Sequence, residues 1–172
     1  MTRIASPNLH AMIQKLHQHS FHGTIAAFDP GETTGFAVFE RGPEHTSLVH
    51  AEQLQTWPLE TGVEELRRAF SYLPTYIVHE AYHVYKWRLA EHTWSEIPTI
   101  QVIGAIKYCA IRRGIPYHRQ TAQIGKGFCS DDKLRNWGLY LEGKVHARDA
   151  IRHGCQFLLF GPPKETTNTT IK

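Results

Sequence analysis

Four side chains in this sequence have the types and positions that a divalent-metal site requires. Asp29 and Glu80 each end a short apolar run, and a carboxylate where a strand leaves the core is costly unless a cation or hydrogen bonds satisfy it. His146 and Asp149 are three residues apart, so on a helix they share one face and can reach one ion together. Three carboxylates and one imidazole suit Mg²⁺ or Mn²⁺, and the nitrogen shifts the preference modestly towards Mn²⁺.

Ordinary structural roles are also open to each of these four residues. Asp29 can belong to a Pro-Gly turn, and Glu80 can be a surface charge at a strand end. His146 can cap a helix, and Asp149 can form a salt bridge. For any one residue the structural role is the simpler interpretation, and only their joint occurrence favours a site.

The elements expected from the hydrophobic pattern would bring the four residues together. The pattern predicts an antiparallel meander of three consecutive strands, at Thr24–Asp29, Gly35–Arg41 and Ser47–Leu54. A helix that begins at Pro58 leads into a strand at Tyr76–Glu80, and a helical crossover makes the pairing of that strand parallel.

The second half of the chain is expected to be mainly helical. We expect a loop over residues 81–96, a helix over Ile97–Arg113, a strand at Ile115–His118, a helix from Ser130 to Leu141 and a last helix over Val145–Phe160. The pattern predicts an α/β fold with a five-stranded mixed sheet, three antiparallel strands followed by parallel ones, flanked by helices.

The composition is that of an ordinary globular protein. Of the 172 residues, 41% are hydrophobic and 20% are charged, which favours one domain with a real core. The longest apolar runs are far shorter than the roughly 20 residues that span a bilayer, and no export signal is visible, so we expect a cytoplasmic protein. Cys109, Cys129 and Cys155 are expected to be buried free thiols because they form no Cys-x-x-Cys pair.

Basic charge gathers in one stretch of the chain. The formal net charge is +3, and from Lys107 to Arg148 nine Lys and Arg residues face three acidic ones. Such clustering points towards a polyanion, because clustered cations neutralise phosphates with release of counterions. A solvated helical face explains the same cluster equally well.

Three motifs, in this order along the chain, resemble those of the RuvC-like Holliday junction resolvases, which are RNase H-fold nucleases of bacteria and their phages. The motifs are DPGETTG at Asp29–Gly35, Glu80 at the end of a strand, and HARDA at His146–Ala150 in the last main helix. The first turn is one residue shorter than in typical bacterial members, which suggests a divergent, phage-encoded protein. Many relatives carry an acid where His146 stands.

The resemblance implies a domain organisation and a reaction. An RNase H-like nuclease domain would span residues 23–160, with an N-terminal helical extension over 1–22 and a polar tail over 161–172. The implied activity is that of a crossover junction endodeoxyribonuclease that leaves 5′-phosphate and 3′-hydroxyl ends. Two Mg²⁺ or Mn²⁺ ions per active site, about 4 Å apart, could activate a water and stabilise the leaving 3′ oxygen. The implied catalytic residues and metal ligands are Asp29, Glu80, His146 and Asp149.

Candidate DNA-binding residues lie in two segments. Aromatic rings interleaved with cations follow the second acidic motif and could stack on unpaired bases while holding phosphates. They are Tyr82, His83, Tyr85, Lys86, Trp87 and Arg88. Resolvases hold DNA with lysines in the corresponding region, and this resemblance implies a second set of DNA-binding residues, Arg119, Lys126, Lys133 and Arg135. Packing of the rings in a core or subunit contact, and a solvated basic face, remain alternatives.

The expected partners are branched DNA and a second copy of the chain. A four-way junction has near two-fold symmetry, so symmetric cutting of two strands calls for a C2 homodimer. The apolar helix Ile97–Ala110 is the interface candidate by likeness to the family, although burial within one subunit explains its pattern equally well. Two other functions stay open, a general branched or flap DNA nuclease and a catalytically silent RNase H-fold DNA-binding protein.

Overall fold

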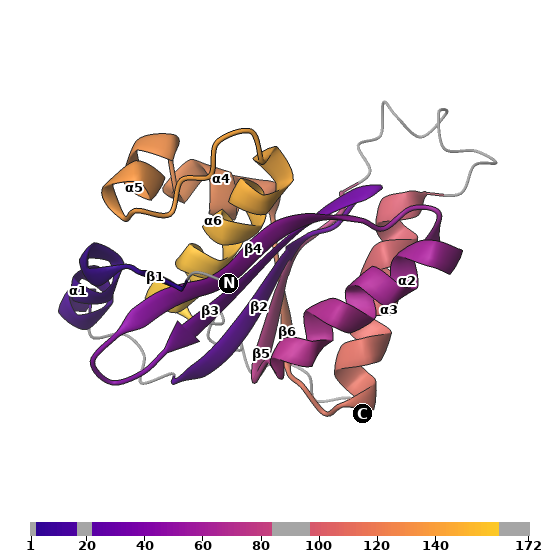
Figure 1. Cartoon of the computed structure of the whole chain (residues 1–172), viewed down its shortest axis with the longest axis horizontal. Helices are drawn as coiled ribbons and strands as arrows, with labels where there is room; N and C mark the ends of the chain where they lie inside the picture. The colour runs from indigo at the N-terminus through magenta and orange to yellow at the C-terminus, as the bar shows by residue number, and fades with distance from the viewer. Residues whose placement is uncertain (1–2, 17–21, 84–96, 162–172) are drawn as a thin grey trace, which may run out of the picture.

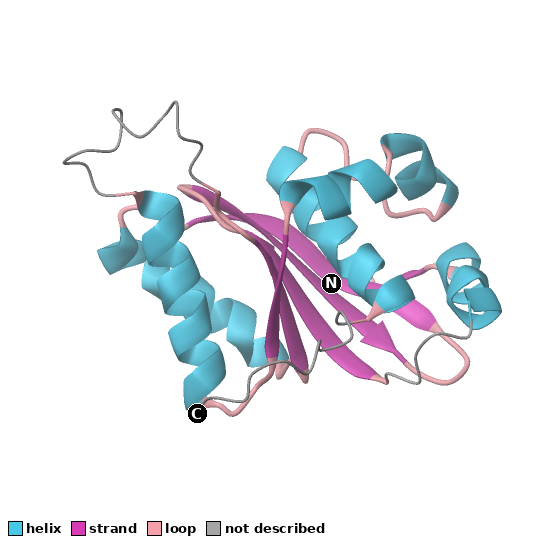
Figure 2. Ribbon diagram, turned by 180° about the vertical axis from the view of Figure 1, so that it is seen from behind, coloured by secondary structure: helices cyan, strands magenta, loops and turns pink. Residues whose placement is uncertain are grey.

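A mixed β-sheet forms the centre of the molecule and carries helices on both faces (Figures 1 and 2). The computed structural model describes residues 3–16, 22–83 and 97–161. In this part of the chain the sheet has six strands in the order β1-β4-β3-β2-β5-β6. The strands are β1 (Ile4–Ala5), β2 (Gly23–Asp29), β3 (Thr33–Arg41), β4 (Thr46–Gln55), β5 (Tyr76–Glu80) and β6 (Tyr117–Gln120). The helices are α1 (Pro7–Leu16), α2 (Leu59–Ala69), the short 3₁₀ helix η1 (Phe70–Tyr72), α3 (Pro98–Arg112), α4 (Ala122–Phe128), α5 (Asp131–Asn136) and α6 (Val145–Phe160).

The strand directions are those predicted from the sequence. β2, β3 and β4 form an antiparallel meander, whereas β5 runs parallel to β2 and β6 runs parallel to β5. β2 is buried on both faces, which explains why its apolar residues are continuous along the chain instead of alternating with polar ones. The predicted fold class is confirmed, with one strand more than expected.

Side chains of the central strands alternate between two cores. Ile25 and Phe39 face the core that α1, α5 and α6 cover. Ala26 and Phe36 face the opposite core, which α2 and α3 cover. The twofold period of the strands therefore fixes a helical layer on each side of the sheet.

The N-terminal helix α1 is packed into the first of these cores. Leu9 and Ile13 are buried there, and β1 pairs with the edge strand β4. The Ser6 hydroxyl donates to the Trp137 carbonyl oxygen at 2.7 Å, which ties the start of α1 to the turn after α5. The sequence does not predict β1, because two residues are too few to show a hydrophobic period.

The segment between β6 and α6 differs most from the predicted elements. α4 was not predicted, since its two glycines lower helix propensity. The helix predicted to reach Leu141 ends at Asn136, because Gly138 adopts a left-handed conformation with φ 69°. The Leu139 N–H then donates to the Leu134 carbonyl oxygen at 2.8 Å and completes a Schellman motif.

The remaining predictions agree closely with the structure. β5 and α6 have the predicted bounds, and β6 begins at Tyr117 instead of Ile115. The cysteines are free thiols, as predicted, and Cys129 and Cys155 are buried, whereas Cys109 is half-buried instead of buried as expected. Among the described residues, no helix combines the length and apolar character needed to span a membrane. Most of the predicted 81–96 loop and 161–172 tail lie outside the described residues.

Candidate active site

Asp29 and Glu80 leave the sheet side by side. β2 and β5 are parallel neighbours in which Phe28 pairs with His79, so the next residue of each strand is one of the two acids. The carboxyl ends of parallel strands meet at the same edge of a sheet. The register therefore confirms that the two strand ends lie together, as the sequence predicted.

The start of α6 brings His146 over Asp29. Asp29 pairs with Gly35 of β3, and Gly35 pairs with Gln53 of β4, so the three form a row across the sheet. The His146 N–H donates to the Gln53 side-chain oxygen at 3.1 Å, and His146 Nδ1 lies 2.9 Å from Asp29 Oδ2. A Cβ on Gly35 would lie 1.8 Å from the His146 carbonyl oxygen, so only glycine lets the helix come this close.

Asp149, one turn farther along α6, is held by two cations. It is 5% exposed, and Arg152 Nη1 donates to its Oδ1. Lys126 Nζ of α4 lies 3.0 Å from Asp149 Oδ2 and 3.7 Å from Glu80 Oε2. The Lys126 ammonium thus links the carboxylates of α6 and β5.

The pKa values of three groups shift in directions that reflect burial and the interaction of these charges. Burial raises the pKa of Asp29, and the charges of Glu80 and Asp149 raise it further, against a hydrogen bond from His146. Burial would also raise the pKa of Glu80. Its contacts with His153 and Lys126 outweigh burial, so the pKa of Glu80 is lowered. Burial would lower the pKa of Lys126, yet the hydrogen bond to Asp149 and the neighbouring acids leave it raised.

The four predicted ligands meet in one place, but they are not arranged as a preformed metal site. Within residues 3–16, 22–83 and 97–161, no three Asp, Glu, His or Cys side chains are grouped so that they could hold a metal ion. The cation between the carboxylates of Glu80 and Asp149 is the ammonium of Lys126. The donor set nevertheless fits a hard divalent cation, because carboxylate oxygens already surround a positive charge there.

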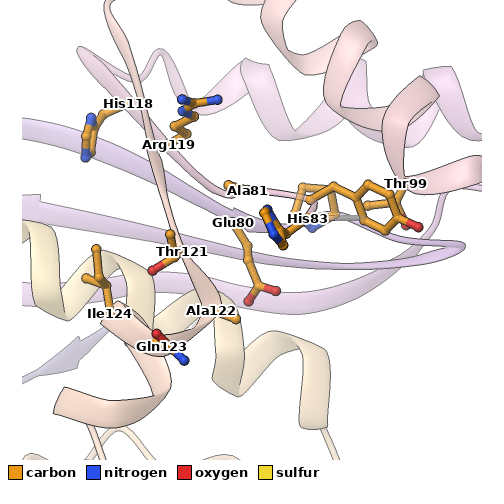
Figure 3. Close-up of a pocket in the computed structure, with 12 residues that line it drawn as sticks. Glu80, Ala81, His83, Thr99, His118, Arg119, Thr121, Ala122, Gln123 and Ile124 are labelled. Carbon is orange, nitrogen blue, oxygen red and sulfur yellow. The ribbon is translucent and has the colours of Figure 1, made fainter. Parts of the chain in front are cut away.

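A cleft of about 790 Å³ lies beside Glu80. Figure 3 shows the Glu80 side chain extending from the end of β5 towards Ala122, at the start of α4. The cleft is therefore bordered by the proposed acidic cluster on one side and by β6 on the other. Its lining residues are Pro30, Glu80, Ala81, Tyr82, His83, Thr99, His118, Arg119, Thr121, Ala122, Gln123 and Ile124.

The predicted DNA-binding residues fall into three groups. Tyr82, His83 and Arg119 line the cleft, and Lys126 lies between the carboxylates. The other two described residues make internal contacts outside the cleft lining. Lys133 Nζ donates to the Phe128 carbonyl oxygen at 2.5 Å, and Arg135 pairs with Asp132 at 3.2 Å and lies over the Tyr140 ring. Outside the described residues are Tyr85, Lys86, Trp87 and Arg88.

Two residues outside the predicted site, His153 and Arg152, hold the acids from behind. His153 Nε2 lies 2.9 Å from Glu80 Oε2, and Arg152 reaches both Asp149 and Asp131. The spacing of His153 carried a usable signal, since a residue four positions after Asp149 on a helix lies on the same face.

Comparison with known proteins shows a shared fold. No protein-family model matches the sequence, and no curated protein matches it. RuvC of Thermus thermophilus in complex with a Holliday junction substrate matches at 18% identity over 80% of this chain and 94% of that chain, with a TM-score of 0.60. The fowlpox virus resolvase in complex with its substrate Holliday junction DNA matches at 14% identity over 78% and 96%, with a TM-score of 0.56. The yeast mitochondrial Holliday junction resolvase matches at 10% identity over 89% and 84%, with a TM-score of 0.51.

We expect Gly35→Ala to displace the start of α6. The added Cβ would collide with backbone atoms of His146, so the free energy of unfolding should fall by about 1–3 kcal/mol, as for other overpacked cores. Urea unfolding measures this change. Gly127→Ala is the control, because nothing lies within 4 Å of its Cβ position, and it should leave stability unchanged or slightly raised. Equal stability of Gly35→Ala and the parent protein would contradict the close approach.

Proposed function

We propose that the protein is a metal-dependent, structure-selective endonuclease that resolves four-way DNA junctions by paired phosphodiester hydrolysis, leaving 5′-phosphate and 3′-hydroxyl ends. The observation that carries the proposal is that Asp29, Glu80 and Asp149 lie at one sheet edge, where their charges interact with one another and with Lys126. The fold supports it, because solved structures that share this fold include two Holliday junction resolvases bound to junction DNA.

The proposed chemistry divides between the acids and their neighbours. Mg²⁺ or Mn²⁺ held by Asp29, Glu80, His146 and Asp149 would supply activation of a water and stabilisation of the leaving oxygen. Asp29 and Asp149 are nearly buried, so their charges act in a medium that screens them weakly. Arg152 fixes the Asp149 carboxylate from the side opposite Lys126, which keeps that ligand in one orientation.

The cleft beside Glu80 is the proposed place of the DNA strand next to the scissile phosphate. Arg119 is exposed at its wall and can neutralise a phosphate, and Tyr82 and His83 supply rings on which a base can stack. Unpaired or splayed bases occur at branch points, so this lining favours branched over continuous duplex DNA.

We expect Asp29→Asn to abolish cleavage of a labelled four-way junction while leaving junction binding within about twofold of the parent. The substitution removes a charged ligand with little change in volume, and loss of a group that acts in catalysis costs orders of magnitude in rate. Gel assays with Mg²⁺ and with Mn²⁺ measure cleavage, and binding is measured in Ca²⁺.

Three outcomes of the same assay would contradict parts of this proposal. Cleavage by Asp29→Asn would show that the site is placed wrongly. Binding without incision by the parent protein in either metal would favour a catalytically silent DNA-binding protein. Equal cutting of junction and linear duplex would count against a junction resolvase.

Lys126→Gln should separate the two roles of the lysine. The carboxylates lose a competing cation, so Mn²⁺ should bind about two- to fivefold more tightly, the worth of one partly exposed ion pair. Junction DNA should bind more weakly, because a cation beside the scissile phosphate is lost. Calorimetry with Mn²⁺ alone and a separate junction-binding assay measure the two effects. Lys107→Gln on α3 makes the same charge change away from the site, and Mn²⁺ affinity that moves equally in both variants would argue against the role of Lys126.

We also propose a homodimer formed through α3. The inner face of this helix is buried against the sheet, which accounts for much of its apolar pattern. Its outer face carries a row of exposed residues at helical spacing, in which Ile100 is 47% exposed and Tyr108 and Ile111 are each 64% exposed. Gly104 lies within this row, with nothing within 4 Å of its Cβ position, so a second helix can approach closely there.

Gly104→Glu should convert the proposed dimer to a monomer without unfolding it. Glutamate is a better helix former than glycine, and its side chain meets no neighbour within the subunit, yet a charge at the centre of an apolar interface weakens association. Sedimentation velocity over a concentration series measures the effect. Ala11→Glu on α1 is the control, and a parent protein that is monomeric at every concentration would refute the dimer.

A further inference from the structure

One buried histidine on α6 faces the candidate site from behind. His153 is 0% exposed, and its ring lies between the ends of β5 and β6. Nε2 lies 2.9 Å from Glu80 Oε2, and Nδ1 lies 2.8 Å from Gln120 Oε1. Both ring nitrogens are therefore used, one for each strand end.

The side chains behind His153 fix which way its ring points. The Gln120 amide nitrogen donates to Gln156 Oε1 at 2.5 Å, which turns the Gln120 oxygen towards the imidazole. Gly125 of α4 covers the ring, and a Cβ there would lie 2.8 Å from His153 Cε1. The ring is thus held by a hydrogen bond on one side and by close packing on the other.

The contact between His153 and Glu80 answers a need of the proposed site. Glu80 reaches the cluster through three rotatable bonds, so it loses more conformational freedom on binding a cation than an aspartate does. Asp149 is already fixed by Arg152, and Asp29 contacts His146. His153 is the corresponding partner of the third acid.

We propose that His153 is a positioning residue that orients the Glu80 carboxylate for a divalent cation. The inference rests on the proposed function, since it assumes that Glu80 is a metal ligand. Any fully buried imidazole needs polar partners, but one of the partners of His153 is the carboxylate of a proposed metal ligand. Outer-shell partners of metal ligands typically contribute about 10- to 100-fold in metal affinity.

The test compares Mn²⁺ binding by the full chain, measured by calorimetry without DNA. His153→Phe keeps a planar ring but removes both ring nitrogens, and we expect Mn²⁺ affinity to fall about tenfold or more. His153→Gln keeps an amide donor and should recover part of that loss. In a Glu80→Gln background His153→Phe should have no further effect, because the two residues act through one carboxylate.

Two further variants keep the test decisive. Phe157→Leu removes buried volume from the same helix, and it should lower the free energy of unfolding without changing Mn²⁺ affinity. If His153→Phe does not fold, Gln120→Leu replaces it in the test. This change removes the hydrogen bond between Gln120 and the His153 ring and leaves the Glu80 side chain in place, and it should also weaken Mn²⁺ binding.

The outcomes distinguish this inference from the proposed function. A parent protein that binds no Mn²⁺ and cuts no junction would overturn both. A parent that binds Mn²⁺ and cuts, alongside a folded His153→Phe of equal Mn²⁺ affinity, would overturn only the role of His153. An equal loss of affinity in the presence and absence of the Glu80 carboxylate would assign His153 a structural role instead.

Discussion

Mutual repulsion among three carboxylates at one sheet edge is the constraint on which the rest of the structure depends. Asp29 and Asp149 are nearly buried, and Glu80 lies beside them, so solvent screens their charges weakly. Lys126 lies between two of the acids, and Arg152 neutralises the far oxygen of Asp149. Burial is the main cause of the raised pKa of Asp29, and the charges of Glu80 and Asp149 raise that pKa further, so the negative charge of the cluster is only partly offset. Such a cluster has remaining capacity for positive charge, which is what a divalent-metal site needs.

The segment between β6 and α6 supplies one of these two cations and contacts the other. α4 carries Lys126, and α5 begins with Asp131, which pairs with Arg152. Arg152 also donates to the Cys129 carbonyl oxygen at 2.9 Å, so one guanidinium joins the site to the turn between the two helices. One of the two glycines that make α4 a poor helix former serves this packing, since Gly125 lets α4 lie directly on α6. Local propensity has been overridden by tertiary contact at the place where cations must approach the acids.

Sequence analysis succeeded where a single residue type or a clear period determines the outcome. The continuous apolar run before Asp29 and the long helical period from Val145 predicted β2 and α6 closely, and the register then placed Asp29 beside Glu80. Contacts between distant residues gave no comparable pattern. The pairing of Lys126 with two acids depends on how α4 packs, and no spacing in the sequence encodes it. The same holds for Gly35, whose requirement for glycine appears only once α6 lies against β3.

Lys126 connects metal binding to substrate binding in the proposed function. In the structure its ammonium serves the carboxylates of Glu80 and Asp149. Divalent cations at the acids would remove its attraction to them, and a phosphate in the adjacent cleft would offer it a new partner. Each ligand then lowers the cost of binding the other, and by linkage the coupling must be the same in both directions. In the proposed function, a lysine that partly offsets the charge of its own acids would stabilise the free protein, and metal ligation would be most complete when a phosphodiester is present.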